Sequence, residues 1–458
     1  RNSSKRNWGF LRKIFVTSVK AAGSLQEQFG MKPGNEREQM EMKAEKAKVL
    51  HTDVVIVGGG PAGLAAAVQL YDEGITDLLI LEREHALGGI LKQCIHDGFG
   101  LTRFGESLSG PEYAARFIKE VEKRKIPYVT DTTVINVTPD HEVQAAHESG
   151  MIIAKAKAVV LTMGCRERTR GALAIQGTRP AGVITAGVAQ AYINLQNRMP
   201  GKEVVILGSG DIGLIMARRL TLEGAHVIGV YEINPIPSGL PRNIEQCLHD
   251  YDIPLHLGYT VSDIKGTDRV TSVVVSKVDK KLQVIEGTEE EIPCDTLVLS
   301  VGLIPENELT LGAGAVLTPA TSGAIVDEYF ETTVPGIFAA GNVLHVHDLV
   351  DFVSLEAEAM ARGIKRYLEG SRYEAVIDVK TGRNVGHTVP QKLTGKEDVT
   401  LSLRVRGPQK NAKITVRQGN HVVAQKLVKN ALPANMIELP IKSNQIIGTA
   451  SLEVSVDE

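Results

Sequence analysis

One glycine pattern occurs twice in the sequence, each time between an apolar run and a helix-like run. The two copies are Gly58-Gly59-Gly60-Pro61-Ala62-Gly63 and Gly208-Ser209-Gly210-Asp211-Ile212-Gly213, whose first glycines are 150 positions apart (208 minus 58). In a strand–turn–helix unit, the first glycine makes the tight turn, the second lets a pyrophosphate approach the backbone, and the third lets the helix pack closely on the strand. The N-terminus of the helix then faces the phosphates. The repeat therefore predicts two dinucleotide-binding units in one chain.

The residues around each turn have the pattern of a strand, a helix and a second strand. Around the first turn these segments are Asp53–Val57, Pro61–Tyr71 and Leu78–Leu81. Around the second turn they are Glu203–Leu207, Gly213–Glu223 and Val227–Tyr231. A chain of 458 residues is too long for one core, so the repeat predicts an α/β fold of two or three domains.

A glutamate follows the second strand of each unit. Glu82 and Glu232 each stand 24 positions after the first glycine of their turn (82 minus 58 and 232 minus 208). A carboxylate at that place can accept hydrogen bonds from an adenosine ribose, and it repels a 2′-phosphate. Arg83, next to Glu82, is also a candidate cofactor-binding residue, whereas no arginine occurs in residues 233–239. The second unit is therefore expected to bind NAD(H) in preference to NADP(H).

Three further segments resemble signposts of the FAD- and NAD(P)-dependent oxidoreductases that have two dinucleotide-binding domains. They are Leu161-Thr162-Met163-Gly164, Val301-Gly302-Leu303-Ile304-Pro305 and Thr333–Asn342. The first two resemble the crossings between the two domains, and the third resembles the strand whose final Gly-Asp holds the FAD ribityl chain. Here that pair is Gly341-Asn342, and an amide oxygen can still accept a hydrogen bond from a ribityl hydroxyl. The resemblance implies FAD and NAD(H) as cofactors, with Gly164, Gly302, Gly341 and Asn342 among the residues that bind them.

The resemblance also implies the domain order, in which an NAD domain is inserted into an FAD domain and both are Rossmann-like. We expect the FAD domain over residues 51–170 and 296–372, and the NAD domain over residues 171–295. Residues 1–50 are expected to form a basic, helical N-terminal arm.

The last part of the chain has a different pattern. Past about Val376, turn residues such as Gly407-Pro408 and Gly419-Asn420 separate runs with strand-like alternation or β-branched residues. These runs are Val399–Val405, Lys413–Arg417, Val422–Val428 and Ser451–Val456. Residues 376–458 are therefore expected to form a small β-sandwich with a structural or docking role.

A narrower resemblance points to a function. Its motifs are Gly89-Ile90-Leu91 with Gln93-Cys94-Ile95-His96, Gly164-Cys165-Arg166-Glu167-Arg168, and Gly182–Gly187. Gly89 is also expected to line the FAD site. The layout resembles the flavoprotein subunits of multi-subunit amino-acid, opine and glycerol-3-phosphate dehydrogenases, the last most closely. The resemblance implies a relay of hydride and electrons between NAD(H) and a partner's flavin or iron–sulfur centre. The cofactors carry such chemistry, so no side-chain nucleophile is required.

The cysteines do not match a disulfide reductase. All four are scattered (Cys94, Cys165, Cys247 and Cys294), and no CxxC pair exists. In disulfide reductases of this superfamily two cysteines follow the double glycine, whereas here Leu91 stands at the first such position after Gly88-Gly89. The alternative function is a free-standing NADH oxidase or peroxidase, with or without a sulfenic acid at Cys94. Cys94 as an ordinary buried residue is the simpler interpretation.

Two histidines are the other candidate catalytic groups. His345 and His347 follow Gly341-Asn342, so they are expected beside the flavin, where they could donate to it or protonate an acceptor. They could equally satisfy local backbone groups. No third ligand stands at a suitable spacing, so no metal is expected. A helix over about Asp351–Glu369 would point its N-terminal dipole at the flavin.

Composition excludes several other classes of protein. A net charge of −3 and an aromatic content of 4% disfavour nucleic-acid partners, and no apolar run has the roughly 18 residues that a transmembrane helix needs. Few, scattered cysteines suit a reducing compartment, so we expect a cytoplasmic location, with an organelle matrix or a membrane surface as alternatives.

The first residues have a character of their own. Residues 1–26 include six basic and no acidic residues, and Trp8, Leu11, Phe15 and Val19 share one face of a helix. This arm is expected to pack on a partner subunit. A transit sequence, a membrane-surface helix, and an arm lying on its own chain are the alternatives.

Overall fold

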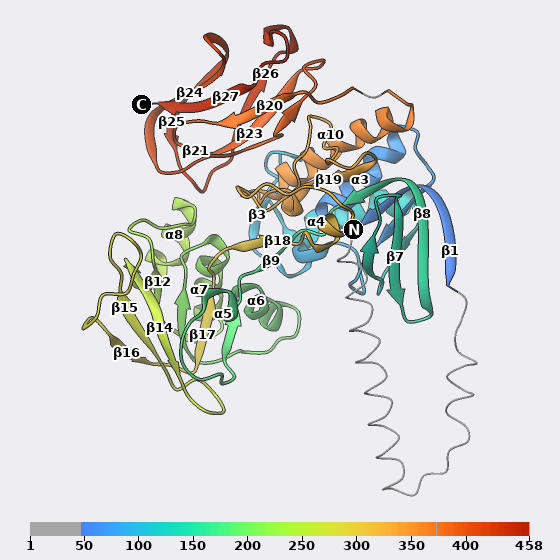
Figure 1. Cartoon of the computed structure of the whole chain (residues 1–458). Helices are drawn as coiled ribbons and strands as arrows, with labels where there is room; N and C mark the ends of the chain where they lie inside the picture. Colours follow the sequence, from blue (N-terminus) through green and yellow to red (C-terminus); the bar gives the residue numbers. More distant parts are fainter. Residues whose placement is uncertain (1–46, 372, 458) are drawn as a thin grey trace, which may run out of the picture. The chain divides into compact units, whose positions relative to one another are not determined.

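The computed structural model describes residues 47–371 and 373–457, and Figure 1 labels their helices and strands. The expected N-terminal arm lies outside these residues, apart from its last positions, where β1 begins at Lys48. None of the helices in the described ranges is long and apolar enough to cross a membrane.

The first unit is built on a seven-stranded sheet in the order β5-β2-β1-β8-β7-β6, with β19 also paired to β8. Its strands are β1 (Lys48–Val57), β2 (Leu78–Leu81), β5 (Tyr128–Val129), β6 (Thr133–Val137), β7 (Glu142–His147), β8 (Gly150–Leu161) and β19 (Ile337–Ala339). Strands β1, β2, β5, β8 and β19 run parallel, and their register aligns Val57 with Leu81 and Leu161, and Leu161 with Ala339. The residues that follow β1, β2, β8 and β19 therefore meet at one edge of the sheet.

Three helices cover one face of this sheet: α3 (Pro61–Asp72), α4 (Gly110–Lys123) and α10 (Val350–Leu368). α10 packs along α3, as Figure 1 shows, because Val353, Ala357, Met360 and Ile364 recur at helical spacing and are buried. The segment between β2 and α4 forms η1 (Gly89–Gln93), β3 (Asp97–Phe99) and β4 (Leu108–Ser109).

The second unit repeats the plan with a five-stranded parallel sheet in the order β10-β17-β11-β12-β13. Its elements are β10 (Val183–Thr185), α6 (Ala186–Asn194), β11 (Glu203–Leu207), α7 (Asp211–Leu222), β12 (His226–Glu232), α8 (Pro241–Cys247), η2 (His249–Tyr251), β13 (Leu255–Leu257) and β17 (Thr296–Leu299). A three-stranded antiparallel sheet of β14 (Tyr259–Lys265), β15 (Ser272–Lys277) and β16 (Glu290–Pro293) shares a core with it. The predicted α/β class with two strand–turn–helix units is confirmed.

The two segments by which the chain enters and leaves the second unit lie side by side. β9 (Cys165–Glu167) pairs antiparallel with β18 (Leu303–Pro305), so both crossings run through one two-stranded ribbon. After β18 the chain forms α9 (Glu308–Gly312) and returns to the first sheet through β19, followed by η3 (Gly341–Val343). α5 (Arg170–Leu173) is a single turn just beyond the ribbon.

The last part of the chain forms two sheets around a core of its own, in the orders β22-β20-β27-β24-β25 and β21-β23-β26. Its elements are β20 (Ile377–Thr381), β21 (Val385–Val389), β22 (Lys392–Leu393), β23 (Val399–Val405), β24 (Gln409–Gln418), β25 (His421–Ala431), β26 (Ile437–Ile441), η4 (Ser443–Gln445) and β27 (Leu452–Asp457). Gly419-Asn420 forms the two-residue turn between β24 and β25, where Gln418 pairs with His421. We call this part the C-terminal β domain; it is the β-sandwich that the sequence predicts.

Candidate functional site

The first glycine turn is shaped by contacts with the end of β8. A Cβ added to Gly58 would lie 2.6 Å from the backbone oxygen of Thr162, and one added to Gly63 would lie 1.9 Å from the oxygen of Gly58. Only glycine fits at these two places. A Cβ on Gly60 would meet nothing nearer than the Cα of Gly89, at 4.0 Å. The second glycine thus faces open space at the N-terminus of α3, where a pyrophosphate could approach the backbone.

The second turn has the same construction, with Ser300 in place of Thr162. A Cβ on Gly208 would lie 2.1 Å from the Ser300 backbone oxygen, and one on Gly213 would lie 2.6 Å from the Ser300 Cβ. The N–H of Gly213 also donates to Ser300 Oγ at 3.0 Å. Gly210 is again less confined, with Ser300 Oγ at 3.4 Å. Both turns are therefore built for close backbone approach at their second glycine.

Two other residues of the second turn have different environments. Asp211 Oδ1 accepts hydrogen bonds from the N–H of Leu240 at 2.8 Å and from Asn243 Nδ2 at 2.7 Å, so it holds the start of α8 beside α7. Ile212 packs against the core of the second unit.

Glu82 is buried behind the first turn, but the protein uses only part of the hydrogen-bonding capacity of its carboxylate. It accepts one hydrogen bond from the N–H of Gly59 at 2.6 Å and one from the N–H of Glu84 at 2.8 Å. A carboxylate has about four lone-pair positions, so capacity remains for ribose hydroxyls. The neighbouring Arg83 pairs with Glu306 at 3.1 Å.

Glu232 is only 3% exposed, and its carboxylate is fully used by the protein. It accepts five hydrogen bonds, from the N–H and Oγ of Ser209, the N–H and Nδ2 of Asn234, and the Oγ of Ser238. Burial favours a raised pKa, but these donors outweigh it and hold the pKa of Glu232 below its usual value. The sequence identified the carboxylate of Glu232 but not its donors Ser238 and Asn234. Their hydrogen bonds to the ionised carboxylate fix residues 232–238 in place.

Asn342 and the two histidines do come together, just beyond β19. Asn342 Oδ1 accepts a hydrogen bond from the N–H of His347 at 3.0 Å and lies 3.3 Å from His347 Nδ1. On its other side, Asn342 Nδ2 lies 3.7 Å from Cys165 Sγ. A Cβ on Gly341 would lie 3.0 Å from the Cβ of Ala62, so this segment also borders the first turn. Cys165 and Asn342 thus link the domain crossing to the end of β19, a contact that the sequence did not indicate.

Glu356 of α10 joins this group. Its Oε2 lies 2.6 Å from His345 Nε2 and 3.4 Å from His347 Nε2, and its Oε1 accepts the N–H of Gly341 at 2.7 Å. The three side chains are 0%, 3% and 8% exposed, in the order His345, His347, Glu356. Their ligand atoms lie within 4.8 Å of one another, so they form a group that could hold a metal ion. The spacing of the histidines did not identify Glu356 as their partner. An acidic residue three positions after Val353, on the apolar stripe of α10, was a signal that its side chain could be buried in the fold.

The protonation of this group follows from burial and charge. Burial alone would raise the pKa of Glu356, but His345 and His347 outweigh it and lower that pKa well below its usual range. Burial also lowers the pKa of His345, against the attraction of Glu356. We therefore assign an ionised Glu356 and a neutral His345 that donates through Nε2. In that tautomer His345 Nδ1 is an acceptor, and it has no hydrogen-bond partner among the described residues.

The N-terminus of α10 does not present a free dipole. Asp351 in its first turn is 2% exposed and accepts the N–H groups of Gly100, Thr102 and Arg103 at 2.7–3.0 Å. This carboxylate offsets the positive end of the helix dipole locally. Its structural effect is to fix the loop between β3 and β4 on α10.

A family model described as pyridine nucleotide-disulphide oxidoreductase matches residues 52–367. The chain belongs to this family. It is accordingly an FAD-dependent oxidoreductase that uses a nicotinamide nucleotide.

Its relatives include the NADPH glutamate synthase small chain of Mycobacterium tuberculosis, 28% identical over 364 residues (71% of this chain and 68% of the relative). The thioredoxin reductase of Listeria innocua is 26% identical over 295 residues (64% and 85%). Among solved structures, thioredoxin reductase of T. acidophilum superposes with a TM-score of 0.57 at 23% identity, covering 70% of this chain and 99% of that one. This last likeness supports the fold alone.

Because the family is named for disulphide chemistry, the contacts and protonation of the thiols of Cys94 and Cys165 bear on the reaction. Cys94 Sγ lies 3.4 Å from the oxygen of Ile90 and 3.7 Å from Gln190 Oε1 of α6. Burial raises the pKa of the Cys94 thiol to about 12 and that of Cys165 to about 11. Neither thiol is ionised at neutral pH, so neither is an activated nucleophile. Cys94 serves the contact between η1 and α6, where Gln93 Nε2 also donates to the oxygen of Gly187 at 2.9 Å.

Gly164 and Gly302 lie at the two crossings between the units of this oxidoreductase. Both have positive φ, of 75° and 101°, and a Cβ on either would meet no atom within 4 Å. The N–H of Glu306 donates to the oxygen of Gly164, and the N–H of Arg168 donates to the oxygen of Gly302. These glycines are thus in position to let the ribbon bend between the units.

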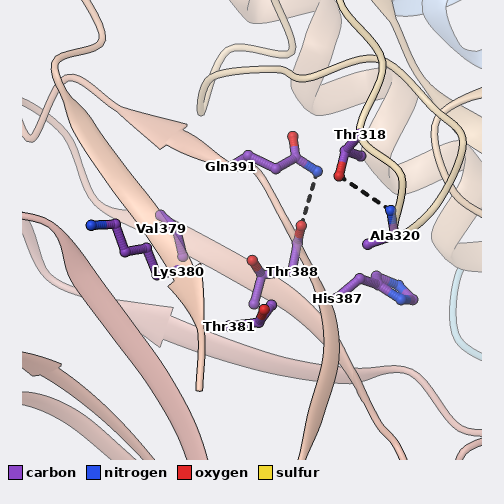
Figure 2. Close-up of a pocket in the computed structure, with 8 residues that line it drawn as sticks. All are labelled: Thr318, Ala320, Val379, Lys380, Thr381, His387, Thr388 and Gln391. Carbon is purple, nitrogen blue, oxygen red and sulfur yellow. Dashed lines mark hydrogen bonds between the residues drawn. The ribbon is translucent and has the colours of Figure 1, made fainter. Parts of the chain in front are cut away.

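A cavity of about 410 Å³ lies apart from both turns, where the C-terminal β domain meets the loop at Thr318 and Ala320. Figure 2 shows Thr318 and Ala320 facing residues of β20 and β21, among them Thr381 and His387. None of its lining residues belongs to either glycine turn.

Proposed function

We propose that this chain is an NAD(H)-linked electron-transfer subunit, with FAD at the first turn, NAD(H) at the second, and a partner redox subunit as the second acceptor or donor. The observation that supports this most directly is the lack of a cysteine pair through which electrons could leave the flavin. The sequence has no CxxC pair, and Cys94 and Cys165 are partly buried with raised pKa values. Electrons that do not leave through a dithiol need another acceptor.

The residues at the first turn fit FAD. Gly60 leaves the backbone open to a pyrophosphate, and the carboxylate of Glu82 keeps two lone-pair positions for ribose hydroxyls. Asn342 lies at the same sheet edge with an amide that can face a ribityl chain. We assign FAD binding to Gly58, Gly60, Pro61, Ala62, Gly63, Glu82, Gly89, Gly164, Gly302, Gly341 and Asn342. Arg83, the remaining candidate beside Glu82, pairs with Glu306.

The residues at the second turn fit NAD(H), and Glu232 acts there through its charge. Gly208, Gly210, Asp211, Ile212 and Gly213 form the turn. The carboxylate of Glu232 has no spare acceptor capacity, but it is a buried anion behind that turn. A 2′-phosphate placed near it would be repelled, so NADH is preferred over NADPH.

When bound, FAD supplies the redox chemistry, by taking hydride from a reduced nicotinamide and passing electrons on. The protein's part is to position the two nucleotides and to shape the charge around them. Asn342 is held by His347, and His345 is held by Glu356, so the segment after β19 is fixed without any residue that must act as a nucleophile.

The class of the complex follows from the narrower motif resemblance. We propose a dehydrogenase complex of the glycerol-3-phosphate type, in a cytoplasmic location. That the glutamate synthase relative is named a small chain is consistent with a subunit role.

The deciding experiment mixes the purified, FAD-loaded protein with NADH or NADPH without oxygen and follows the flavin band near about 450 nm. Rapid bleaching by NADH, and slower bleaching by NADPH, is expected. Flavin that stays oxidised with both would overturn the assignment of the second site. Oxygen or hydrogen peroxide is then added: slow reoxidation supports a relay subunit, whereas fast turnover supports a free-standing oxidase or peroxidase.

A further inference from the structure

The C-terminal β domain reaches the segment that carries the two histidines. Arg404 on β23 donates from Nη2 to the backbone oxygen of Val346 at 3.0 Å and lies 3.5 Å from the carboxylate of Asp348. The N–H of Met436, the residue before β26, donates to Asp348 Oδ2 at 3.3 Å. One side chain of the β domain therefore contacts residues 346–348 at two points.

We propose that Arg404 is a positioning residue of the flavin site and that the C-terminal β domain is part of that site. The inference rests on the proposed location of FAD at Asn342. Asn342 Oδ1 accepts the N–H of His347, and Arg404 holds the residues on both sides of His347, so a displacement at Arg404 is passed directly to Asn342.

The guanidinium of Arg404 is held firmly enough for this role. Its Nη1 also donates to the oxygens of Pro433, at 3.0 Å, and Ala434. Its side chain is only 16% exposed, and burial lowers its pKa against the attraction of Asp348. Desolvating a cation is costly, and a simple attachment of one domain to another does not require it. Surface attachment is provided elsewhere, by Arg366 with Glu397 at 2.7 Å.

A second residue of the β domain approaches the same group. His387 on β21 is the cross-strand partner of Arg404, and its ring centroid lies 6.0 Å from that of His345. Its Nε2 has no hydrogen-bond partner among the described residues, as is also true of His345 Nδ1. The β domain thus covers the histidine group with a cation and an imidazole from one strand pair.

The test compares Arg404→Gln and Arg404→Lys with Arg406→Gln as the control. Arg406 is exposed, two positions further along, and donates from Nε to the oxygen of Val385 within the β domain. FAD affinity is measured by titrating the apo-protein with FAD and following flavin fluorescence, and the flavin midpoint potential is measured by equilibration with redox dyes. We expect Arg404→Gln to weaken FAD binding roughly tenfold, Arg404→Lys to fall between it and wild type, and Arg406→Gln to match wild type.

Asp348→Asn provides a second variant in case Arg404→Gln does not fold. It removes the ion pair from the other side, leaves the β domain untouched, and keeps an oxygen for Met436. A weaker FAD affinity or a shifted midpoint potential in this variant supports the proposal. Wild-type FAD affinity and potential in folded Arg404→Gln, or in Asp348→Asn if the former does not fold, would overturn it. Because FAD binding is measured without NADH, failure of the NAD(H) assignment would be seen separately.

Discussion

His345 Nε2 lies 2.6 Å from Glu356 Oε2, and the two side chains are 0% and 8% exposed. The imidazole comes from the segment after β19 and the carboxylate from the second turn of α10, so this hydrogen bond closes the loop between them. The other oxygen of Glu356 accepts the N–H of Gly341. One carboxylate therefore fixes both ends of residues 341–345.

Replacing Glu356 should loosen that loop. Glu356→Ala leaves His345 and the Gly341 N–H without their acceptor, and a buried unsatisfied group costs about 1–3 kcal/mol. We expect a lower thermal midpoint and weaker FAD binding, measured by calorimetry and fluorescence titration. Glu369→Ala, at the exposed end of α10, is the control. Unchanged FAD affinity in Glu356→Ala would show that the loop is fixed by other contacts.

The His345–His347–Glu356 group is expected to contain no metal, although Glu356 supplies the third ligand that the sequence spacing did not reveal. His345 Nε2 donates to Glu356, and the positive charge of Arg404 lies near enough to lower the pKa of His345, which disfavours a further cation. Elemental analysis of the purified protein should find less than about 0.1 transition-metal ion per chain, and a chelator should leave FAD affinity unchanged. A stoichiometric metal that a chelator removes would contradict this.

Cys94 is expected to be dispensable for hydride transfer. With a pKa near 12 its thiol is not an activated nucleophile, and its contacts are with η1 and α6. Cys94→Ser should be reduced by NADH at a rate within about twofold of wild type in a stopped-flow measurement. A reduction rate more than tenfold below that of wild type would indicate that the Cys94 thiol takes part in the reaction.

Glu232 is expected to control the choice between NADH and NADPH. Glu232→Gln removes the charge and weakens five hydrogen bonds, so the KM for NADH should rise. The preference for NADH should fall at the same time, because the repulsion of a 2′-phosphate is lost. Steady-state kinetics with both nucleotides measures this, with the exposed Glu223→Gln as the control. An unchanged ratio of kcat/KM values would show that the charge plays no part.

Asp327 is expected to make stability depend on pH. Burial, with Glu328 next to it, raises the pKa of Asp327 from 3.8 to about 7. The folded state therefore holds a proton that the unfolded state has released, and stability is lost as pH rises from about 4 to 7, by up to about 1.4 kcal/mol per pH unit. Asp327→Asn keeps an oxygen for the N–H groups of Tyr329 and Glu331.

Denaturant unfolding at pH 5 and pH 8 tests this point. The variant should gain stability over wild type on going from pH 5 to pH 8. Parallel curves for the two proteins would mean that Asp327 is ionised in the fold throughout this range.

The elements closest to the glycine turns could be predicted from the sequence. Leu78–Leu81 and Glu203–Leu207 are strands with the predicted bounds, and Pro61–Tyr71 differs from α3 by one residue. The second predicted helix, Gly213–Glu223, begins two residues late, because α7 starts at Asp211. Val399–Val405 also has the predicted bounds, because alternate side chains on β23 are buried in the β domain. Local periodicity and turn chemistry suffice for such elements.

The contacts that join distant segments could not be predicted in this way. Glu356 meets His345 because α10 packs against the segment around η3, and Arg404 meets Asp348 because the β domain lies against the segment after β19. The sequence indicated only part of the surroundings of Glu232 and Cys94, because their partners are distant in the chain or lie in a loop. Cys94 contacts Gln190 of α6, and Glu232 accepts hydrogen bonds from Ser209 and Ser238. Spacing along one strand or helix carries no information about these partners.

The ribbon of β9 and β18 gives the inserted unit adjoining ends. Cys165 pairs with Pro305 and Glu167 with Leu303, so the chain departs and returns at one place in the fold. An exchange of residues 168–302 between two such proteins would have to match only these neighbouring joints, while the rest of the chain kept its own sheets intact. On the proposed assignment of NAD(H) to the second unit, one such exchange would replace the nucleotide preference.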